Sequence, residues 1–255
     1  MERVYLISDV HLGGHAAEIE KQKIESLLSF LEAVQDQADL LYIVGDLYDF
    51  WFEYRRVIPK MDLKVLFKLR RLVESGVQII YLAGNHDIWL GSYLANEIGI
   101  TIHHGPLVVE HNSLKLYIAH GDGLAKRDHL VRFLNFLFKN RLNVFLYRLI
   151  HPDLGIPFAH FIANISRGKG DNPYDADYRE FARAKWSEGY DVVILGHSHI
   201  PVFEKVQDKY YINLGDWIEH FSYLELSNTQ PLLKTWSKIP EEDVTSSKLL
   251  HRSKV

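Results

Sequence analysis

Five short polar motifs in this chain hold side chains of the types that bind divalent metal ions. Each motif follows an apolar run, and the five are Asp9-Val10-His11, Gly45-Asp46-Leu47-Tyr48-Asp49, Gly84-Asn85-His86-Asp87, His120-Gly121-Asp122 and Gly196-His197-Ser198-His199. Seven of their residues can act as ligands: Asp9, His11, Asp46, Asn85, His120, His197 and His199. A mixed set of oxygen and nitrogen ligands favours Mn²⁺, Fe or Zn²⁺ over Ca²⁺ or Mg²⁺. Shared between two ions, these ligands leave positions open for water and substrate.

The apolar runs that precede the motifs must bring them together. These runs are 4–7, 40–44, 79–82, 116–119 and 192–195, and continuous apolar runs of this length predict buried strands. Because sites in open α/β folds collect where strands end, we expect one shared site rather than five separate turns. Without a metal, so many unpaired buried charges would each cost several kcal/mol. The other nine histidines are predicted to be ordinary structural residues: His15, His103, His104, His111, His129, His151, His160, His220 and His251.

The order of the predicted elements indicates the fold class. Apolar residues at helical spacing predict helices at 18–36 and 61–75, between the first strands. The later elements are predicted to be extended: hairpins at 107–119 and 202–214, and strands at 222–226 and 232–236. Alternating strands and helices followed by hairpins predict an α/β (α+β) protein in which two packed sheets are flanked by helices.

The chain is predicted to form one domain over 1–240, with a helical cap inserted at about 124–170 and a polar, mobile tail at 241–255. The inserted segment carries eight Lys and Arg against two Asp, about +6, in a chain whose net charge is −4. Cations within 130–150 argue against a membrane span, because each costs roughly 2.5–3.5 kcal/mol at the bilayer centre. Two helices joined near Asn140-Arg141 fit better. They form either an ordinary subdomain or a cap with an apolar cleft and a basic surface for an anionic membrane.

The composition excludes several classes of function. Because the chain has no Cys, it cannot contain disulfides, thiolate metal sites or a Cys nucleophile. A net charge of −4 gives no support to nucleic-acid binding. The N-terminal run Met1-Glu2-Arg3-Val4 leads directly into a strand without a signal peptide, which predicts a cytoplasmic protein.

In their order along the chain, the motifs resemble those of the calcineurin-like metallophosphoesterase superfamily. The pattern is Asp-x-His, Gly-Asp-x-x-Asp, Gly-Asn-His-Asp, a later His and Gly-His-x-His, and it spans 4–217. The resemblance implies a four-layer sandwich of two facing mixed β-sheets, and two divalent metal ions, Mn²⁺ before Fe or Zn²⁺. By motif position, one ion is bound by Asp9, His11, Asp46 and His199, and the other by Asp46, Asn85, His120 and His197. The implied reaction is hydrolysis of a phosphoester or pyrophosphate.

His86 and Asp49 are the predicted catalytic residues. His86 follows a ligand without being assigned as one, so we expect it to donate to a phosphoryl oxygen or to protonate the leaving group. The resemblance gives Asp49 the role of orienting His86, with Asp87 as the alternative partner.

Three further features narrow the substrate. They are the helical insertion, the run Ser166-Arg167-Gly168-Lys169-Gly170 at its end, and Asn213-Leu214-Gly215-Asp216-Trp217 after the second hairpin. The cations and backbone N–H groups of the second feature can hold a diphosphate. Together the features resemble the UDP-2,3-diacylglucosamine diphosphatase branch, which releases UMP and 2,3-diacylglucosamine 1-phosphate in lipid A biosynthesis, at the cytoplasmic face of the inner membrane. The resemblance places substrate contacts at Asn85, Asp122, Ser166, Arg167 and Lys169.

One departure from that branch keeps two alternatives open. Its best-known members have Arg at the position of His86 and Glu at that of Asp49, whereas this chain has the pair typical of the wider superfamily. The first alternative is a phosphoesterase that acts on a soluble nucleotide or another phosphodiester. The second is a binding module that kept the fold and lost catalysis, which the complete ligand set disfavours.

Overall fold

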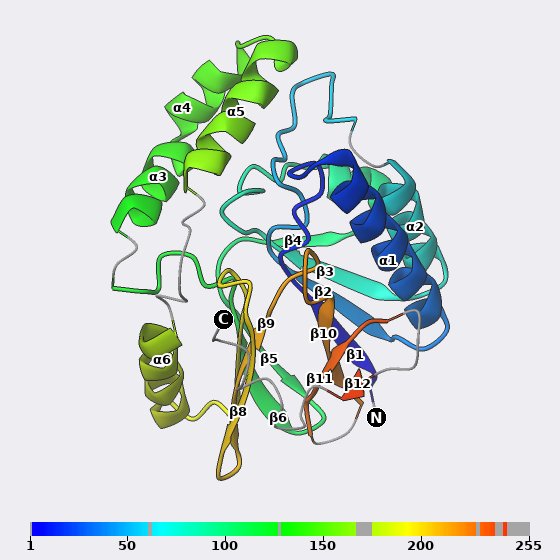
Figure 1. Cartoon of the computed structure of the whole chain (residues 1–255), viewed down its shortest axis with the longest axis vertical. Coiled ribbons are helices and arrows are strands. Elements are labelled where there is room, and N and C mark those ends of the chain that lie inside the picture. The colour runs from blue at the N-terminus through cyan, green and yellow to red at the C-terminus, as the bar shows by residue number, and fades with distance from the viewer. Residues whose placement is uncertain are drawn as a thin grey trace.

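Two β-sheets pack face to face and carry all five motif-bearing strands (Figure 1). The computed structural model describes residues 2–60, 63–126, 129–166, 175–227, 230–237 and 242–243. The larger sheet has seven strands in the order β12 (Glu242–Asp243), β11 (Leu232–Thr235), β10 (Ser222–Leu226), β1 (Val4–Ile7), β2 (Leu40–Val44), β3 (Gln78–Leu82) and β4 (Thr101–His103). The smaller sheet has five, in the order β5 (Leu107–His111), β6 (Leu114–Ile118), β7 (Val192–Leu195), β9 (Lys209–Leu214) and β8 (Pro201–Val206).

Both sheets are mixed, and the motif-bearing strands in each sheet run parallel to one another. In the larger sheet β1, β2, β3 and β4 are parallel, while β10, β11 and β12 are antiparallel to their neighbours. In the smaller sheet β6, β7 and β9 are parallel, and β5 and β8 complete antiparallel hairpins. The carboxyl ends of β1, β2 and β3 therefore meet at one edge of the larger sheet, and those of β6 and β7 meet at one edge of the smaller.

Helices α1 (Ala17–Gln35), α2 (Leu63–Glu74) and α6 (Asp175–Ser187) cover the outer faces of the sheets. The remaining helices are α3 (His129–Lys139), α4 (Arg141–Arg148), α5 (Pro152–Ser166) and a short π-helix, η1 (Leu94–Ile98). Side chains of α1 and α2 share a core with the larger sheet, and α6 shares one with the smaller sheet. The result is the four-layer arrangement expected from the motifs, with α3, α4 and α5 extending beyond the sheets at the upper left of Figure 1.

The apolar runs follow from burial on both faces. Along β1, Val4 and Leu6 face the core between the sheets, while Tyr5 and Ile7 face the core beneath α1 and α2. Successive strand residues point to opposite faces, so a strand that is covered on both sides must be apolar at every position. The predicted fold class of two packed mixed sheets flanked by helices is confirmed.

Most predicted elements agree closely with the structure, and the insertion contains more helix than expected. The helices expected at 18–36 and 61–75 are α1 and α2, and the two hairpins are β5–β6 and β8–β9. The join inside the insertion falls at Asn140, whose side chain accepts a hydrogen bond from the Leu142 N–H at 2.9 Å and so begins α4. Helix α5 was not predicted, because its apolar residues surround it and Pro157 lies in its interior.

Two further observations concern the predicted domain limits. The tail predicted over 241–255 falls outside the described residues, except for β12, which pairs with β11. Within the described part of the chain, every helix is too short or too polar to cross a lipid bilayer.

Candidate metal centre

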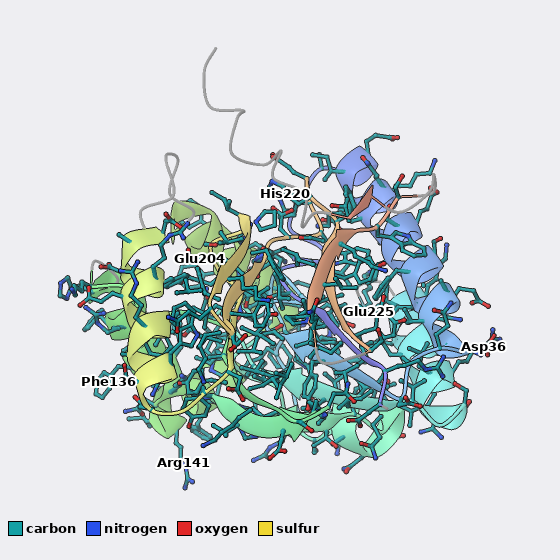
Figure 2. All side chains as sticks on the ribbon, turned by 90° about the horizontal axis from the view of Figure 1, so that it is seen from below. Asp36, Phe136, Arg141, Glu204, His220 and Glu225 are labelled. Atoms are coloured by element: carbon teal, nitrogen blue, oxygen red, sulfur yellow. The ribbon has the colours of Figure 1, made fainter. Side chains whose placement is uncertain are left out.

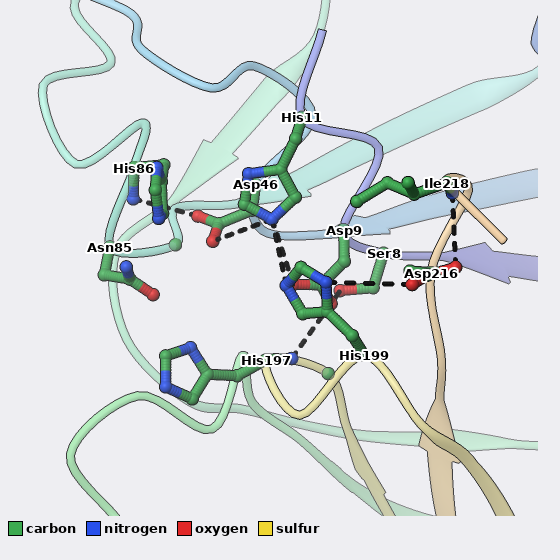
Figure 3. A network of polar contacts seen from close by, with 12 residues as sticks. Ser8, Asp9, His11, Asp46, Asn85, His86, His197, His199, Asp216 and Ile218 are labelled. Atoms are coloured by element: carbon green, nitrogen blue, oxygen red, sulfur yellow. Dashed lines mark hydrogen bonds and ion pairs between the residues drawn. The ribbon is translucent and has the colours of Figure 1, made fainter. Parts of the chain in front are cut away.

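Left-handed backbone turns aim the predicted ligands into the site. Five of the seven have positive φ angles: Asp9 (54°), His11 (49°), Asp46 (53°), His197 (66°) and His199 (61°). This region is unfavourable for residues with a side chain, and such strain concentrates at functional sites. Each turn follows directly on β1, β2 or β7, so the strand ends determine where these side chains point (Figure 3).

The first group of ligand atoms lies between the loops after β1 and β7. Asp9 Oδ1 is 3.6 Å from His11 Nε2 and 3.4 Å from His199 Nε2, and the two imidazole nitrogens are 3.2 Å apart. The other carboxylate oxygen of Asp9 accepts hydrogen bonds from Ser8 Oγ at 2.6 Å and from the His197 N–H at 2.9 Å. Asp9 Oδ1 is buried and accepts no hydrogen bond within the described residues. A buried carboxylate oxygen that accepts no hydrogen bond and faces two imidazoles is suited to bind a cation.

The second group of ligand atoms surrounds Asp46. Asp46 Oδ2 is 3.2 Å from His120 Nε2 and 3.7 Å from His11 Nε2, so one carboxylate faces both groups. Asn85 Oδ1 is 3.1 Å from His120 Nε2, and His197 belongs to the same cluster as Asp46 and His120. His120 Nδ1 lies 2.9 Å from the Val44 carbonyl, which can only accept, so Nδ1 carries the proton and Nε2 is left for a ligand bond.

The charges around these groups favour a cation. Burial alone would raise the pKa of Asp9, but the nearby imidazoles of His11, His120 and His199 lower it, and the carboxylate stays ionised. Burial disfavours charge on His120, yet Asp46 raises the pKa of His120 well above its usual value, so the site favours a positive charge here, which a bound cation would supply in place of the Nε2 proton. Burial lowers the pKa of His197 to about 4, which keeps that imidazole neutral and able to bind a metal.

Glycines in the motifs allow the loops to approach these side chains. A Cβ added to Gly84 would lie 2.1 Å from Asp46 Oδ1, and one added to Gly196 would lie 2.2 Å from Ser8 Oγ. Gly45, with φ +82°, would place a Cβ 2.4 Å from His120 Nδ1. These positions accept only glycine because the neighbouring atoms are themselves held in place by the site.

His86 lies beside both groups, between the loops after β2 and β3. Its backbone N–H donates to Asp46 Oδ1 at 2.9 Å, and its Nδ1 is 3.0 Å from the backbone carbonyl of Asp49. The Asp49 carboxylate is further away, with Oδ1 3.6 Å from His86 Nδ1, so the carbonyl rather than the carboxylate orients the ring most directly. Burial lowers the pKa of His86 to about 4. One nitrogen of His86 also falls within a ligand-sized cluster with His11 and Asp46.

Comparison with known proteins places this arrangement in a family. The sequence model of the calcineurin-like phosphoesterases matches residues 2–201. The chain belongs to the calcineurin-like phosphoesterase family. It is therefore a metal-binding phosphoester hydrolase, as the motifs predicted.

Relatives of this phosphoesterase include curated enzymes of one name. A UDP-2,3-diacylglucosamine hydrolase of Porphyromonas gingivalis is 33% identical, over 91% of this chain and 97% of its own length. One of Pseudomonas savastanoi pv. phaseolicola is 29% identical, over 93% of this chain and 97% of its own. Among solved structures, an archaeal phosphodiesterase is 18% identical with a TM-score of 0.48, covering 91% of this chain and 98% of that one.

Only some of the residues predicted to contact substrate lie in the described part of the chain. Asn85 lies in the second group of ligands, and Asp122 is close enough to His120 and His197 to influence both electrostatically. Ser166 ends α5, while Arg167 and Lys169 fall outside the described residues. The contacts predicted for Ser166, Arg167 and Lys169 therefore stay predictions.

Two acids outside the ligand set hold parts of the phosphoesterase site. Asp87 accepts from the backbone N–H groups of Gly84 at 2.8 Å and Leu47 at 2.9 Å and from the Tyr81 hydroxyl, which ties together the loops after β2 and β3. Asp216 Oδ2 is 3.7 Å from His199 Nδ1, and Oδ1 accepts from three successive N–H groups beginning at Ile218. Sequence reasoning noted the motif that contains Asp216 without giving it this role.

A buried amine supports the first ligand loop from behind. Lys23 on α1 is buried, and its Nζ donates to the His11 carbonyl at 2.7 Å and to Glu20 Oε1 at 2.6 Å. Glu20 also accepts from the N–H groups of Gly13 at 3.0 Å and His15 at 2.9 Å. A lysine at a helical position carries no sequence signal for this role, because its partner is a backbone carbonyl.

Replacing Glu20 with glutamine is expected to make stability less dependent on pH. Partial burial raises the pKa of Glu20, but hydrogen bonds from His15, Lys23 and Gly13 outweigh that effect and lower it to about 2. The folded pKa lies below the unfolded one, so the stabilisation is complete near neutral pH and is lost as the pH falls toward 2. Because Glu20 is only partly buried and solvent screens its charge, we expect Glu20→Gln to lower the free energy of unfolding by about 1–2 kcal/mol at pH 7.

Urea unfolding at pH 7 and pH 4 measures this contribution. The loss in free energy of unfolding caused by Glu20→Gln should be smaller at pH 4 than at pH 7. Glu18→Gln, which alters an exposed neighbour on the same helix, should cause no loss at either pH. A deficit of equal size at both pH values would contradict the assigned charge.

Proposed function

We propose that this phosphoesterase hydrolyses the pyrophosphate of UDP-2,3-diacylglucosamine to UMP and 2,3-diacylglucosamine 1-phosphate, with two divalent ions, Mn²⁺ in the first place. The observation that supports this choice of substrate is an apolar surface on the insertion, beside the metal centre. Of the large apolar side chains that the described residues expose, 11 of 18 belong to 133–161: Phe133, Phe136, Leu137, Leu142, Phe145, Leu146, Leu149, Ile150, Leu154, Phe158 and Phe161. A surface of this kind suits acyl chains.

The insertion is attached close to the ligand loops. Tyr147 on α4 packs against Phe52 and Trp89, with ring centroids 4.8 Å and 5.1 Å apart, and these two residues belong to the segments that follow β2 and β3. Trp89 Nε1 donates to the Phe138 carbonyl at 2.7 Å. An acyl chain held on α3–α5 would therefore lie next to a phosphate held at the ligands. The names of the relatives support the same substrate.

Basic residues accompany the apolar surface. Lys139, Arg141 and Arg148 lie on α3 and α4, and Phe136 and Arg141 stand at the outer margin of the molecule in Figure 2. Exposed apolar side chains together with cations favour the surface of an anionic membrane. The proposal therefore includes peripheral contact with the cytoplasmic face of the inner membrane, where a lipid substrate is available.

The residues of the site divide the work of hydrolysis. Asp9, His11, Asp46 and His199 would hold one ion, and Asp46, Asn85, His120 and His197 the other. When bound, two such ions supply Lewis acidity to the phosphoryl oxygens and to the attacking water. Asp46 faces both groups and would serve both ions, while the hydrogen bond of His120 Nδ1 to the Val44 carbonyl would leave Nε2 as its ligand atom.

His86 has a narrower role in this reaction than in hydrolysis of an alkyl ester. Because its Nδ1–H donates to the Asp49 carbonyl, only Nε2 remains to face the substrate. The leaving group is a phosphate monoester with a second pKa near 6, so it departs without taking a proton. To donate to a phosphoryl oxygen through Nε2, His86 must carry a second proton, which burial disfavours by lowering its pKa to about 4. A bound anionic phosphate would offset that effect, so His86 is assigned as a hydrogen-bond donor to a phosphoryl oxygen of the bound substrate.

A Mn²⁺-supplemented assay tests the substrate. UDP-2,3-diacylglucosamine should be cleaved to UMP, with a kcat/KM at least about 100-fold above that for UDP-N-acetylglucosamine, since loss of two buried acyl chains removes several kcal/mol of binding. Cyclic nucleotides serve as the test of the alternative function. Activity confined to UDP-N-acetylglucosamine or cyclic nucleotides would reject the lipid substrate while keeping the phosphoesterase.

A paired variant tests the apolar surface. Changing Phe133 and Phe145 together to Ser should raise the KM for the acylated substrate about tenfold or more and leave the metal content unchanged. Phe67→Ser, which alters an equally exposed phenylalanine on α2, is the matched control and should have no effect. An unchanged KM in the double variant would place the acyl chains elsewhere.

A further inference from the structure

We propose that His160, on α5 of the insertion, is a positioning residue that links the inserted helices to the metal ligand His11 through the carboxylate of Asp49. His160 Nδ1 lies 2.8 Å from Asp49 Oδ2. The other oxygen of the same carboxylate, Oδ1, is 3.4 Å from His11 Nδ1. Asp49 is buried, with 1% of its side chain exposed, so the two imidazoles face a carboxylate that is shielded from water.

The chemistry of the three groups fixes which atoms carry protons. An ionised carboxylate only accepts hydrogen bonds, so His160 Nδ1, 2.8 Å from Asp49 Oδ2, must carry a proton. His11 Nδ1 is buried and makes no hydrogen bond within the described residues, but the negative charge of Asp49 Oδ1 at 3.4 Å favours a proton on that atom. A proton on His11 Nδ1 leaves Nε2 as the ligand atom, and Nε2 is the atom that faces Asp9, Asp46 and His199. Carboxylates behind metal-binding histidines set the tautomer and ring orientation in this way.

His160 holds the carboxylate rather than merely filling space beside it. Asp49 is anchored through its backbone, whose N–H donates to the Leu12 carbonyl at 3.0 Å, but its side chain can still rotate about χ1 and χ2. The hydrogen bond from His160 selects the rotamer in which Oδ1 faces His11. Without that donor the Asp49 carboxylate is held less firmly, and the negative charge that favours a proton on His11 Nδ1 is less well fixed in place.

The position of α5 is itself defined by packing. A Cβ added to Gly155 would lie 2.8 Å from Tyr54 Oη and 3.1 Å from Tyr147 Oη, so the helix passes directly over these two side chains. The His160 ring lies edge-on to Phe50, with centroids 6.1 Å apart. Whatever holds or shifts α5 therefore acts on the Asp49 carboxylate, and through it on a ligand of the first group. The inserted helices thus help to build the metal site as well as to bind substrate.

Three substitutions at His160 separate hydrogen bonding from packing. His160→Phe keeps a ring against Phe50 but has no donor, and His160→Ala removes both. His160→Asn places an amide N–H close to where Nδ1 stood, so it restores the donor without the ring. His104→Ala, which removes an exposed histidine outside α5, is the matched control.

The first readout is Mn²⁺ binding by titration calorimetry, which does not depend on the lipid substrate. Loss of a group that supports a ligand typically weakens binding by a factor of 10–100, so the Ala and Phe variants should bind one Mn²⁺ about tenfold more weakly, while Asn stays within about threefold of the wild type. With bis(p-nitrophenyl) phosphate as a soluble probe, kcat should fall about tenfold in the Ala and Phe variants at an unchanged KM.

Two results would overturn the proposal. One is wild-type Mn²⁺ affinity in the Phe variant, which would show that the ring alone matters. The other is an Asn variant as weak as the Phe variant, with the thermal midpoint of both at the wild-type value. Rejection of the lipid substrate in the earlier assay would leave these measurements unaffected, because they rest only on His11 as a ligand.

Discussion

Replacing Asp46 with alanine is expected to remove both metal binding and activity. Asp46 Oδ2 lies between His120 and His11, at 3.2 Å and 3.7 Å from their Nε2 atoms, so its loss damages both groups of ligands. Removal of this carboxylate also leaves the four imidazole ligands with one negative charge fewer to offset two cations. We expect kcat/KM to fall by about 1000-fold or more, equivalent to about 4 kcal/mol of transition-state stabilisation.

Metal content and activity are measured together in this experiment. Wild-type protein loaded with Mn²⁺ and desalted should retain two ions per chain, and Asp46→Ala fewer than one. Asp208→Ala, an exposed acid in the turn between β8 and β9, controls for a general loss of negative charge and should keep both ions. Two ions held with wild-type affinity by Asp46→Ala would disprove the bridging role.

Replacing His86 with alanine is expected to reduce turnover while keeping two metal ions. The ligand atoms of the two groups do not depend on the His86 ring, and its backbone N–H, which donates to Asp46 Oδ1, survives the substitution. A hydrogen-bond donor to the phosphoryl group contributes a factor of about 100–1000 to kcat. Turnover at the wild-type rate would show that His86 has no catalytic role.

The identity of the leaving group distinguishes the two roles that His86 can play. If His86 donates to a phosphoryl oxygen, His86→Ala loses the same factor with p-nitrophenyl and with alkyl phosphodiesters. If it protonates the leaving group, the loss is much greater for alkyl esters, whose oxygen leaves poorly without a proton.

The sequence predicts the sheets and the convergence of the ligands because both depend on local patterns. Strands such as β1 and β7 are buried on both faces, so each one is a continuous apolar run that periodicity analysis detects. The ligands follow these runs directly, and the ends of parallel strands necessarily meet. Asp9, Asp46 and His199 could therefore be expected in one site before their distances were known.

The supporting residues could not be predicted, since their partners are distant in sequence or belong to the backbone. His160 lies 111 residues from Asp49 and looks like an isolated histidine in an apolar helix. Helix α5 itself is hidden by Pro157 and by apolar residues on every side. The family resemblance implied that Asp49 orients His86, but it could not show that the Asp49 carbonyl lies 3.0 Å from His86 Nδ1 while the carboxylate faces His11 and His160.

The parallel pairing of β6 with β7 has a consequence for how substrate preference can change. Parallel neighbours need a crossover connection of about a dozen residues, and a single helix such as α6, which packs on these strands, is enough to provide it. The helices α3–α5 are additional length within the same crossover, so they can be shortened, extended or exchanged without altering any strand pairing. Chimeras that transplant this segment between relatives should therefore move acyl selectivity as a unit, provided that the graft supplies a donor to Asp49.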